Sequence, residues 1–183
     1  MDEPPVFTVG HSTLSIDEFV DLLRVGKVQR LVDVRTIPRS RTNPQYNLDT
    51  LPGTLAGYQI SHTIIPELGG RRKKQKAVDP DTNSFWQNQS FHNYADHALS
   101  EDFDAGLQRL LKLTAKERCA IMCSEAVWWR CHRRIISDYL LLHGKEVFHL
   151  MGKNRMEAAR MTPGAVEVVG VLHYPGASQG ARR

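Results

Sequence analysis

Short apolar runs, each ended by glycine, proline or a polar residue, recur along the first 150 residues of the chain. Such runs, rich in β-branched residues, are typical of strands buried on both faces. They predict strands over residues 6–9, 31–34, 63–65, 119–123 and 147–150. Residues 166–172 form a further apolar run, and residues 174–183 are predicted to be a frayed tail.

Helical patterns lie between these runs. Ser15 and Glu18 form a capping box, apolar residues at 16, 19, 20, 22 and 23 give one helical face, and Gly26 is a natural stop. Further helices are predicted over 48–58, 91–99, 102–113, 130–142 and 154–161, with Ser100 capping the one over 102–113. Strands alternating with helices predict an α/β domain around a mainly parallel sheet flanked by helices.

Composition narrows the class of protein. The 183 residues fit a single domain with a sizeable core, and the formal net charge of +4 suits anionic ligands without matching a DNA-coating protein. Three cysteines, an odd number without framework spacing, predict a reduced chain. With no signal pattern and no apolar run long enough to span a bilayer, we expect a cytoplasmic protein without a membrane segment.

Polar residues gather where the predicted strands end. In parallel sheets ligands bind outside the carboxyl ends of the strands, so these residues predict a site at that rim. They are His11 and Ser12 after the first strand; Arg35, Arg39 and Arg41 after the second; Glu67, Gly69 and Gly70 after the third; Cys123, Ser124 and Glu125 after the fourth; and His149 in the fifth.

Several of these residues belong to motifs in a fixed order. The motifs are Thr8-Val-Gly-His-Ser12, Asp33-Val-Arg35 with Pro38-Arg-Ser40, Glu67-Leu-Gly-Gly70, and Cys123-x-Glu125 followed by Cys131-His-Arg133. In them the chain resembles the DUF488 family of uncharacterised proteins over about residues 6–152, with 153–183 as a C-terminal extension. The resemblance implies an α/β domain and marks these positions, but it implies no reaction. We expect a three-layer Rossmann- or rhodanese-like sandwich.

Cys123 is the first candidate for chemistry. In rhodaneses and cysteine phosphatases, a cysteine after a strand heads a loop of inward-pointing N–H groups at a helix N-terminus, which stabilises a thiolate. Here six residues separate Cys123 from Arg130, none is glycine, and one is Glu125. This disfavours a literal phosphatase. Nucleophilic or redox chemistry at Cys123 is one interpretation, and a small buried thiol that ends a strand is the other.

Glu125 and His11 are the candidates for proton transfer. Glu125 is either a general acid or base or a residue that caps the following helix. His11 is either a proton shuttle or a loop residue that satisfies backbone groups, and Gly10 permits close backbone approach. The sequence lacks CxxC and HxxxH spacings, so we predict no metal site from Cys123, Glu125, Cys131 and His132, and no cofactor is assigned.

Arginines at the rim predict an anionic ligand. Arg35, Arg39 and Arg41, with Ser12, can hold a phosphate or carboxylate, and Cys131, His132 and Arg133 at the start of the helix are further substrate-binding candidates. Neighbouring positions on a helix differ by about 100°, so one of Cys131 and His132 is expected to face the site. A structural pairing of Asp33 with Arg35 is the alternative for Arg35, because alternation places both on one side of the strand.

A basic run follows the third strand. Its members are Arg71, Arg72, Lys73, Lys74 and Lys76, and their interpretation is either a solvated loop or a contact with nucleic-acid phosphates.

The leading hypothesis is an intracellular enzyme that acts on a nucleotide, a nucleic acid or a phosphorylated substrate with Cys123 or Glu125. A nucleic-acid-binding module and a thiol redox or sulfurtransferase-like protein are the alternatives. The oligomeric state stays open.

Overall fold

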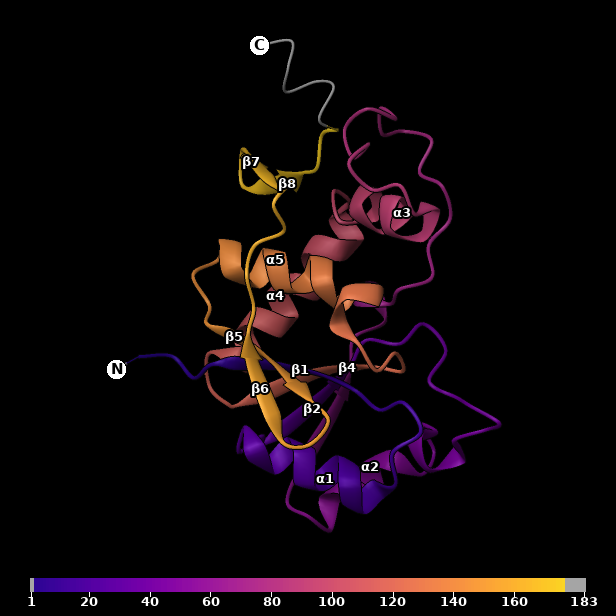
Figure 1. The fold of residues 1–183 in the computed structure, drawn as a ribbon, viewed down its shortest axis with the longest axis vertical. Coiled ribbons are helices and arrows are strands. Elements are labelled where there is room, and N and C mark those ends of the chain that lie inside the picture. The colour runs from indigo at the N-terminus through magenta and orange to yellow at the C-terminus, as the bar shows by residue number, and fades with distance from the viewer. Residues whose placement is uncertain (1, 177–183) are drawn as a thin grey trace.

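The computed structural model describes residues 2–176, in which a six-stranded sheet is covered by helices on both faces (Figure 1). The strand order is β3-β2-β4-β1-β5-β6, and only the last pairing is antiparallel. The strands are β1 (Val6–Gly10), β2 (Arg30–Asp33), β3 (Ser61–Ile64), β4 (Cys119–Cys123), β5 (Val147–Met151) and β6 (Arg155–Ala158). The predicted α/β class with a mainly parallel sheet is therefore confirmed.

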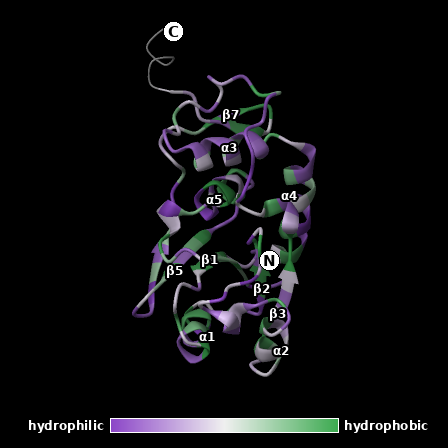
Figure 2. Cartoon of the chain, turned by 90° about the vertical axis from the view of Figure 1, so that its right-hand side faces the viewer, coloured by the Kyte–Doolittle hydropathy of each residue, from purple (hydrophilic) through white to green (hydrophobic). Residues whose placement is uncertain are grey.

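The helices complete a three-layer sandwich, visible edge-on in Figure 2. On one face lie α1 (Ile16–Val25) and α2 (Leu51–Ala56); on the other lie α3 (Gln89–His97), α4 (Glu101–Thr114) and α5 (Arg133–Leu142). Single 3₁₀ turns are η1 (Pro44–Tyr46), η2 (Pro66–Leu68) and η3 (Trp128–Arg130). None of the helices in residues 2–176 is long and apolar enough to cross a membrane.

Alternation along β4 divides the core into two clusters. Cys119 and Ile121 join the cluster beneath α3, α4 and α5, whereas Ala120 and Met122 join the cluster beneath α1 and α2. Successive side chains of a strand point to opposite faces, so a strand covered on both faces has a continuous apolar run. This explains why the run over 119–123 carries no polar alternation.

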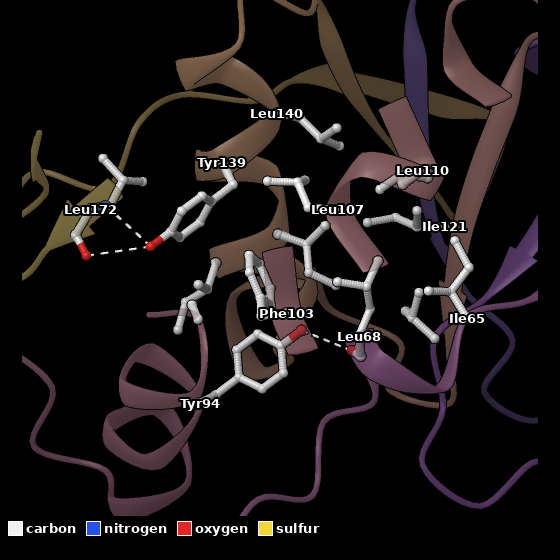
Figure 3. Packing of buried hydrophobic residues seen from close by; sticks show 14 of the residues in the cluster. Ile65, Leu68, Tyr94, Phe103, Leu107, Leu110, Ile121, Tyr139, Leu140 and Leu172 are labelled. Atoms are coloured by element: carbon white, nitrogen blue, oxygen red, sulfur yellow. Dashed lines mark hydrogen bonds between the residues drawn. The ribbon is translucent and has the colours of Figure 1, made fainter. Parts of the chain in front are cut away.

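The larger cluster ties distant segments to the sheet (Figure 3). Phe103, Leu107 and Leu110 of α4 pack over it, and the Tyr94 hydroxyl of α3 donates to the Leu68 carbonyl at 2.8 Å. Buried hydroxyls need partners, and this bond fixes α3 to η2, next to Gly69 and Gly70.

Three predicted helix caps, on two helices, are confirmed. Ser15 and Glu18 form the reciprocal capping box of α1, and Gly26 caps its C-terminus. The Ser100 hydroxyl accepts from the Phe103 amide at 3.2 Å and so caps α4.

The C-terminal third departs from the predictions. The helix predicted over 154–161 is wrong, because residues 155–158 instead form β6, an antiparallel edge of the sheet. Here backbone pairing with β5 outweighs local helix propensity. The apolar run over 166–172 is a hairpin of β7 (Val166–Val168) and β8 (Val171–His173).

The prediction of a frayed tail over 174–183 is wrong at its first residue. Tyr174 is buried, and its hydroxyl donates to Asp138 at 2.9 Å. Residues 177–183 of that tail lie outside the described residues.

The connections leave the sheet in opposite directions at β1 and β4. From β1 the chain passes through α1 to β2 on one side, and from β4 it passes through α5 to β5 on the other. The two helices lie on opposite faces, so a crevice opens between the carboxyl ends of these neighbouring strands. His11 directly follows β1 and Ser124 directly follows β4.

Candidate functional site

A pocket of about 700 Å³ lies at this crevice. It collects most of the residues predicted to form the rim site, Arg71 of the basic run and Ser40 of the Pro38-Arg-Ser40 motif, together with several residues that the sequence did not single out. The predicted members are His11, Ser12, Arg35, Arg39, Ser40, Gly70, Arg71, Cys123, Ser124, Glu125, Cys131 and His132. The additional ones are Thr13, Thr36, Ile37, Asn43, Ser90, Phe91 and Arg130.

Arg133 lies beneath the pocket rather than in it. It is 1% exposed, and its Nε donates to the Cys123 sulfur at 3.1 Å. Its other nitrogens donate to the Thr8 hydroxyl at 3.1 Å and the Glu125 carbonyl at 2.8 Å. None of the ion pairs formed by residues 2–176 includes Arg133, and burial lowers its pKa to about 9, an effect that the Glu125 charge partly opposes.

A neutral chain of hydrogen bonds holds this cation in place. The Thr8 hydroxyl accepts from Arg133 and forms a hydrogen bond with His149 Nδ1 at 2.7 Å, and the His149 ring stacks on Trp128. Burial, with the charge of Arg133, lowers the pKa of His149 to about 3. His149 is therefore a buried neutral imidazole and does not line the pocket, although it lies in the fifth strand as predicted.

The sulfur atoms of Cys123 and Cys131 are paired as a disulfide. The sequence predicted three reduced cysteines, and this pairing corrects that expectation. The end of β4 and the residue two before α5 are brought together by the loop that contains η3. Cys119 is the free cysteine; it is buried, and burial with the nearby Glu117 charge raises its pKa to about 12. Both paired sulfurs border the pocket.

Cys131 has partners of its own. Its sulfur lies 3.4 Å from His132 Nδ1 and accepts from the Arg133 backbone N–H at 3.4 Å. The His132 Nε2–H donates to the Val34 carbonyl at 2.8 Å, which leaves Nδ1 as the unprotonated nitrogen. Burial, with the charges of Arg133 and Arg72, lowers the pKa of His132 to about 4.

The predicted helical start at Arg130 is wrong, and so is the expectation that only one of Cys131 and His132 faces the site. Cys131 is extended (φ −128°, ψ 150°), and α5 begins at Arg133. Because the two residues precede the helix, their side chains do not follow its 100° spacing, and both border the pocket.

His11 and Arg35 form a second cluster beside the sulfurs. The His11 Nδ1–H donates to the Ser12 carbonyl at 2.8 Å, and the ring stacks on Tyr46 with centroids 4.2 Å apart. Arg35 NH1 approaches His11 Nε2 at 3.4 Å. Burial, with the Arg35 charge, lowers the pKa of His11, so the imidazole is neutral near pH 7.

Most of the Arg35 guanidinium is already engaged. Nε and NH2 donate to the two Asp33 oxygens at 2.9 and 2.7 Å, and NH2 also donates to the Tyr46 carbonyl at 2.7 Å. Burial alone would raise the pKa of Asp33, but contacts with His62 and Arg35 outweigh it and the pKa is lowered. The structural Asp33–Arg35 pairing, one of the two interpretations of the sequence, is therefore present.

Charged side chains at the pocket mouth are mostly positive. Arg39, Arg71 and Arg130 are exposed, and the exposed Glu125 is the acidic residue that lines the pocket among the described residues. The helix-capping interpretation of Glu125 is wrong, because α5 has its N-cap at His132, without a side-chain bond. The Glu125 carbonyl is instead held by Arg133, in a space that a side chain at Gly10 would occupy.

Other predicted residues lie away from the pocket. Arg41 borders a shallow recess with Arg39, and the Arg72 side chain donates to the carbonyls of Pro66, Glu67 and Gly69. Glu67 forms an ion pair with Arg109 at 3.4 Å. Lys73, Lys74 and Lys76 are exposed in the loop that leaves the pocket at Arg71.

The sequence indicated Arg133 only as a substrate ligand. Its position two residues after Cys131, on the buried face of an apolar helix, is the signal that would have placed it in the interior. No signal in the sequence connected Thr8 with Arg133, since 125 residues separate them. Within residues 2–176, no group of three or more His, Cys, Asp or Glu side chains is placed to hold a metal ion.

Comparisons with known proteins give one match. The family model of the domain of unknown function DUF488 matches residues 15–140, which include β2, β3, β4 and the first part of α5. No curated protein and no solved structure matches the chain significantly. Because the family model covers more than half of the chain, the protein belongs to the DUF488 family.

Proposed function

We propose that the protein is an enzyme that binds an anionic substrate in the rim pocket and attacks it with the thiolate of Cys123. The observation that carries this proposal is the buried Arg133 guanidinium, which has its Nε 3.1 Å from the Cys123 sulfur and no carboxylate paired with it among the described residues. An unpaired buried charge is costly, and a thiolate in the reduced protein would neutralise it. A neighbouring arginine likewise favours a thiolate over a thiol, and the thiolate is the nucleophile.

The charges around the pocket support an anionic substrate. Among the described residues that line the pocket, three exposed arginines carry positive charge and one carboxylate, that of Glu125, carries negative charge. The arginines are Arg39, Arg71 and Arg130. Guanidinium groups bind phosphate and carboxylate through paired N–H donors. A volume of about 700 Å³ is in the range of pockets that hold a nucleotide-sized ligand.

Glu125 is the group in the pocket suited to proton transfer. Its carbonyl is fixed by Arg133, so the exposed carboxylate is held at the mouth of the pocket rather than on a free loop. His11 is less suited, since Ser12 and Arg35 occupy its two nitrogens and it is 2% exposed. In this proposal His11 positions Arg35, and Glu125 exchanges protons with the substrate.

Two alkylating probes test the proposal without a known substrate. Iodoacetate and iodoacetamide share a leaving group, but only iodoacetate is anionic. In the freshly reduced protein, Cys123 should react with both at about pH 6, where an ordinary thiol is largely protonated. The ratio of the iodoacetate rate to the iodoacetamide rate should exceed that of glutathione and should fall in R39Q/R71Q/R130Q. The mass of the Cys123 peptide reports the reaction, and buried Cys119 serves as an internal control.

Slow alkylation of Cys123 at pH 6 would contradict the proposal that Cys123 is the nucleophile. An iodoacetate preference no greater than that of glutathione would contradict the proposal that the substrate is anionic.

Exposed lysines beyond Arg71 favour a second candidate, in which the anion is a nucleic acid. Lys73, Lys74 and Lys76 continue the basic surface from the pocket along one loop. Binding to a single-stranded oligonucleotide should weaken steeply with salt, and K73Q/K74Q/K76Q should reduce the slope of log K against log salt by roughly two. Binding that ignores both salt and these lysines would exclude this candidate.

A further inference from the structure

We infer that Cys131 is the second thiol of a dithiol site and that the pocket takes an anionic disulfide as its substrate, which the two cysteines reduce. This inference rests on the proposed function of Cys123. It adds the class of bond that is attacked, the residue that completes the reaction and the group that takes the proton.

The contact between the two sulfurs is the starting observation. Cys123 and Cys131 are paired, both border the pocket, and they come from opposite ends of the loop that closes it. A second thiol against a nucleophilic cysteine can complete a reaction in which sulfur displaces the adduct on that cysteine. Mixed disulfides are displaced in this way, whereas acyl or phosphoryl adducts are released by water.

The surroundings of the two sulfurs differ in a way that assigns their roles. Cys123 faces the fixed cation of Arg133, a donor that keeps it ready as a thiolate. Cys131 faces a proton acceptor, because His132 donates Nε2–H to Val34 and turns the lone pair of Nδ1 toward the sulfur at 3.4 Å. The Arg133 backbone N–H, at the start of α5, stabilises negative charge on Cys131 as it forms.

Gly70 allows this arrangement. A β-carbon at that position would overlap the His132 ring, so the chain passes directly against the imidazole and holds it beside Cys131. Burial and the Arg133 charge keep the pKa of His132 near 4, so the imidazolium formed in the reaction does not persist and returns its proton quickly.

The reaction proceeds in two exchanges. The Cys123 thiolate attacks one sulfur of the substrate disulfide, a Cys123–S bond forms, the substrate S–S bond breaks, and the first product leaves as a thiolate beside the pocket arginines. Cys131 then passes its proton to His132 Nδ1 and attacks the Cys123 sulfur, which releases the second thiolate; that product takes up the proton. The substrate gains two electrons and the protein dithiol becomes the Cys123–Cys131 disulfide, which an external dithiol reductant returns to the starting state.

Ellman's reagent, a dianionic aromatic disulfide, is the probe, and the coloured thiolate it releases is counted per chain. The reduced wild-type protein should release two equivalents in one fast phase and end with the internal disulfide. C131S should release one and retain the probe on Cys123, and C123S should lose the fast phase. H132Q should slow the second release at least tenfold and leave the first unchanged, an effect that a merely structural role for His132 would not produce.

A neutral disulfide, 2,2′-dithiodipyridine, should react with the wild type at least tenfold more slowly than Ellman's reagent, after correction for the rates of both probes with glutathione. Equal corrected rates for the two probes would overturn the inference that the substrate disulfide is anionic. The mass of the wild-type product tests the roles of Cys123 and Cys131 even if a variant fails to fold. A wild type that stops with the probe on Cys123 would overturn the role of Cys131 and leave the proposed function standing. A Cys123 that fails to react would overturn both.

Discussion

The guanidinium of Arg133 donates to the sulfur of Cys123 across the boundary between α5 and β4, at 3.1 Å, from a side chain that is 1% exposed. Burial lowers the pKa of His11, His132 and His149, and the same guanidinium adds to this effect, so one buried cation helps to keep three imidazoles neutral. The buried Arg133 therefore influences the protonation of the groups around the crevice from the interior of the protein. In the proposed function, the exposed arginines at its mouth have a different task, which is to attract the anionic substrate.

Replacing Arg133 with methionine should separate these two tasks. R133M removes the cation but fills much of its volume, so the thiolate fraction of Cys123 at about pH 6.5 should fall at least tenfold. Iodoacetamide rates measured against pH report the change. R130M is the matched control, because Arg130 borders the pocket mouth; it should change the preference for iodoacetate and leave the pH profile in place. Identical pH profiles for R133M and the wild type would show that Arg133 does not control the thiol.

Acid should destabilise the fold before the carboxylates titrate. The pKa of His132 is about 4 and that of His149 about 3, against about 6.5 in the unfolded chain. The unfolded chain therefore binds more protons in this range, and the free energy of unfolding falls as pH decreases below about 7. Each such histidine lowers the free energy of unfolding by about 1.4 kcal/mol per pH unit below about 6.5.

Urea unfolding between pH 7.5 and 5.5 measures this dependence. H149Q removes one titrating group while its amide can still form a hydrogen bond with Thr8, so its profile should be flatter than that of the wild type. H143Q, at an exposed histidine, should keep the wild-type slope. A wild-type stability that stays constant over this range would contradict the neutral buried imidazoles.

Gly10 should tolerate no side chain. A β-carbon there would overlap the Glu125 carbonyl oxygen, which Arg133 holds from the other side. G10A should lower the free energy of unfolding by about 1–3 kcal/mol, the range for overpacking, and slow the alkylation of Cys123. G53A is the control: a β-carbon at Gly53, within α2, meets nothing, so helix propensity should leave stability unchanged or raise it by up to about 1 kcal/mol. Equal stabilities of the two variants would refute the close approach.

The segment after β6 should contribute to the stability of the whole fold. Asp138 of α5 accepts from the Thr162 amide at 2.9 Å and from the Tyr174 hydroxyl at 2.9 Å, and burial raises its pKa. Y174F leaves a buried carboxylate oxygen without this donor and should cost about 1–3 kcal/mol. Y58F removes a bond to Asp17 at the surface and should cost less than about 0.5 kcal/mol. Chemical denaturation compares them, and equal midpoints would mean that the C-terminal segment is not fastened in this way.

Local patterns in the sequence determined the elements and their order. Apolar runs predicted the five parallel strands because parallel strands covered on both faces are mostly apolar. The pattern is weakest in the edge strand β3, which contains Ser61, His62 and Thr63 and is exposed or only partly buried. The Ser15–Glu18 box and the Ser100 cap predicted helix starts because these bonds close within four residues. The rule that ligands bind at the carboxyl ends of parallel strands then placed His11, Arg35 and Cys123 at one rim, since each of them follows or ends such a strand.

Only the tertiary structure decided how those residues are used. Residues 155–158 became a strand because β5 offered a free edge, which no local signal records. Arg133 reached Thr8 across 125 residues, and Cys131, which is extended between η3 and the start of α5, reached Cys123. Contacts between residues so far apart in the sequence depend on how whole helices and strands pack. The effect of a charged side chain depends on whether it is buried. The sequence thus predicted which side chains gather at the carboxyl ends of the strands, and the packing of α5 against β1 and β4 supplied the buried cation and the paired sulfurs.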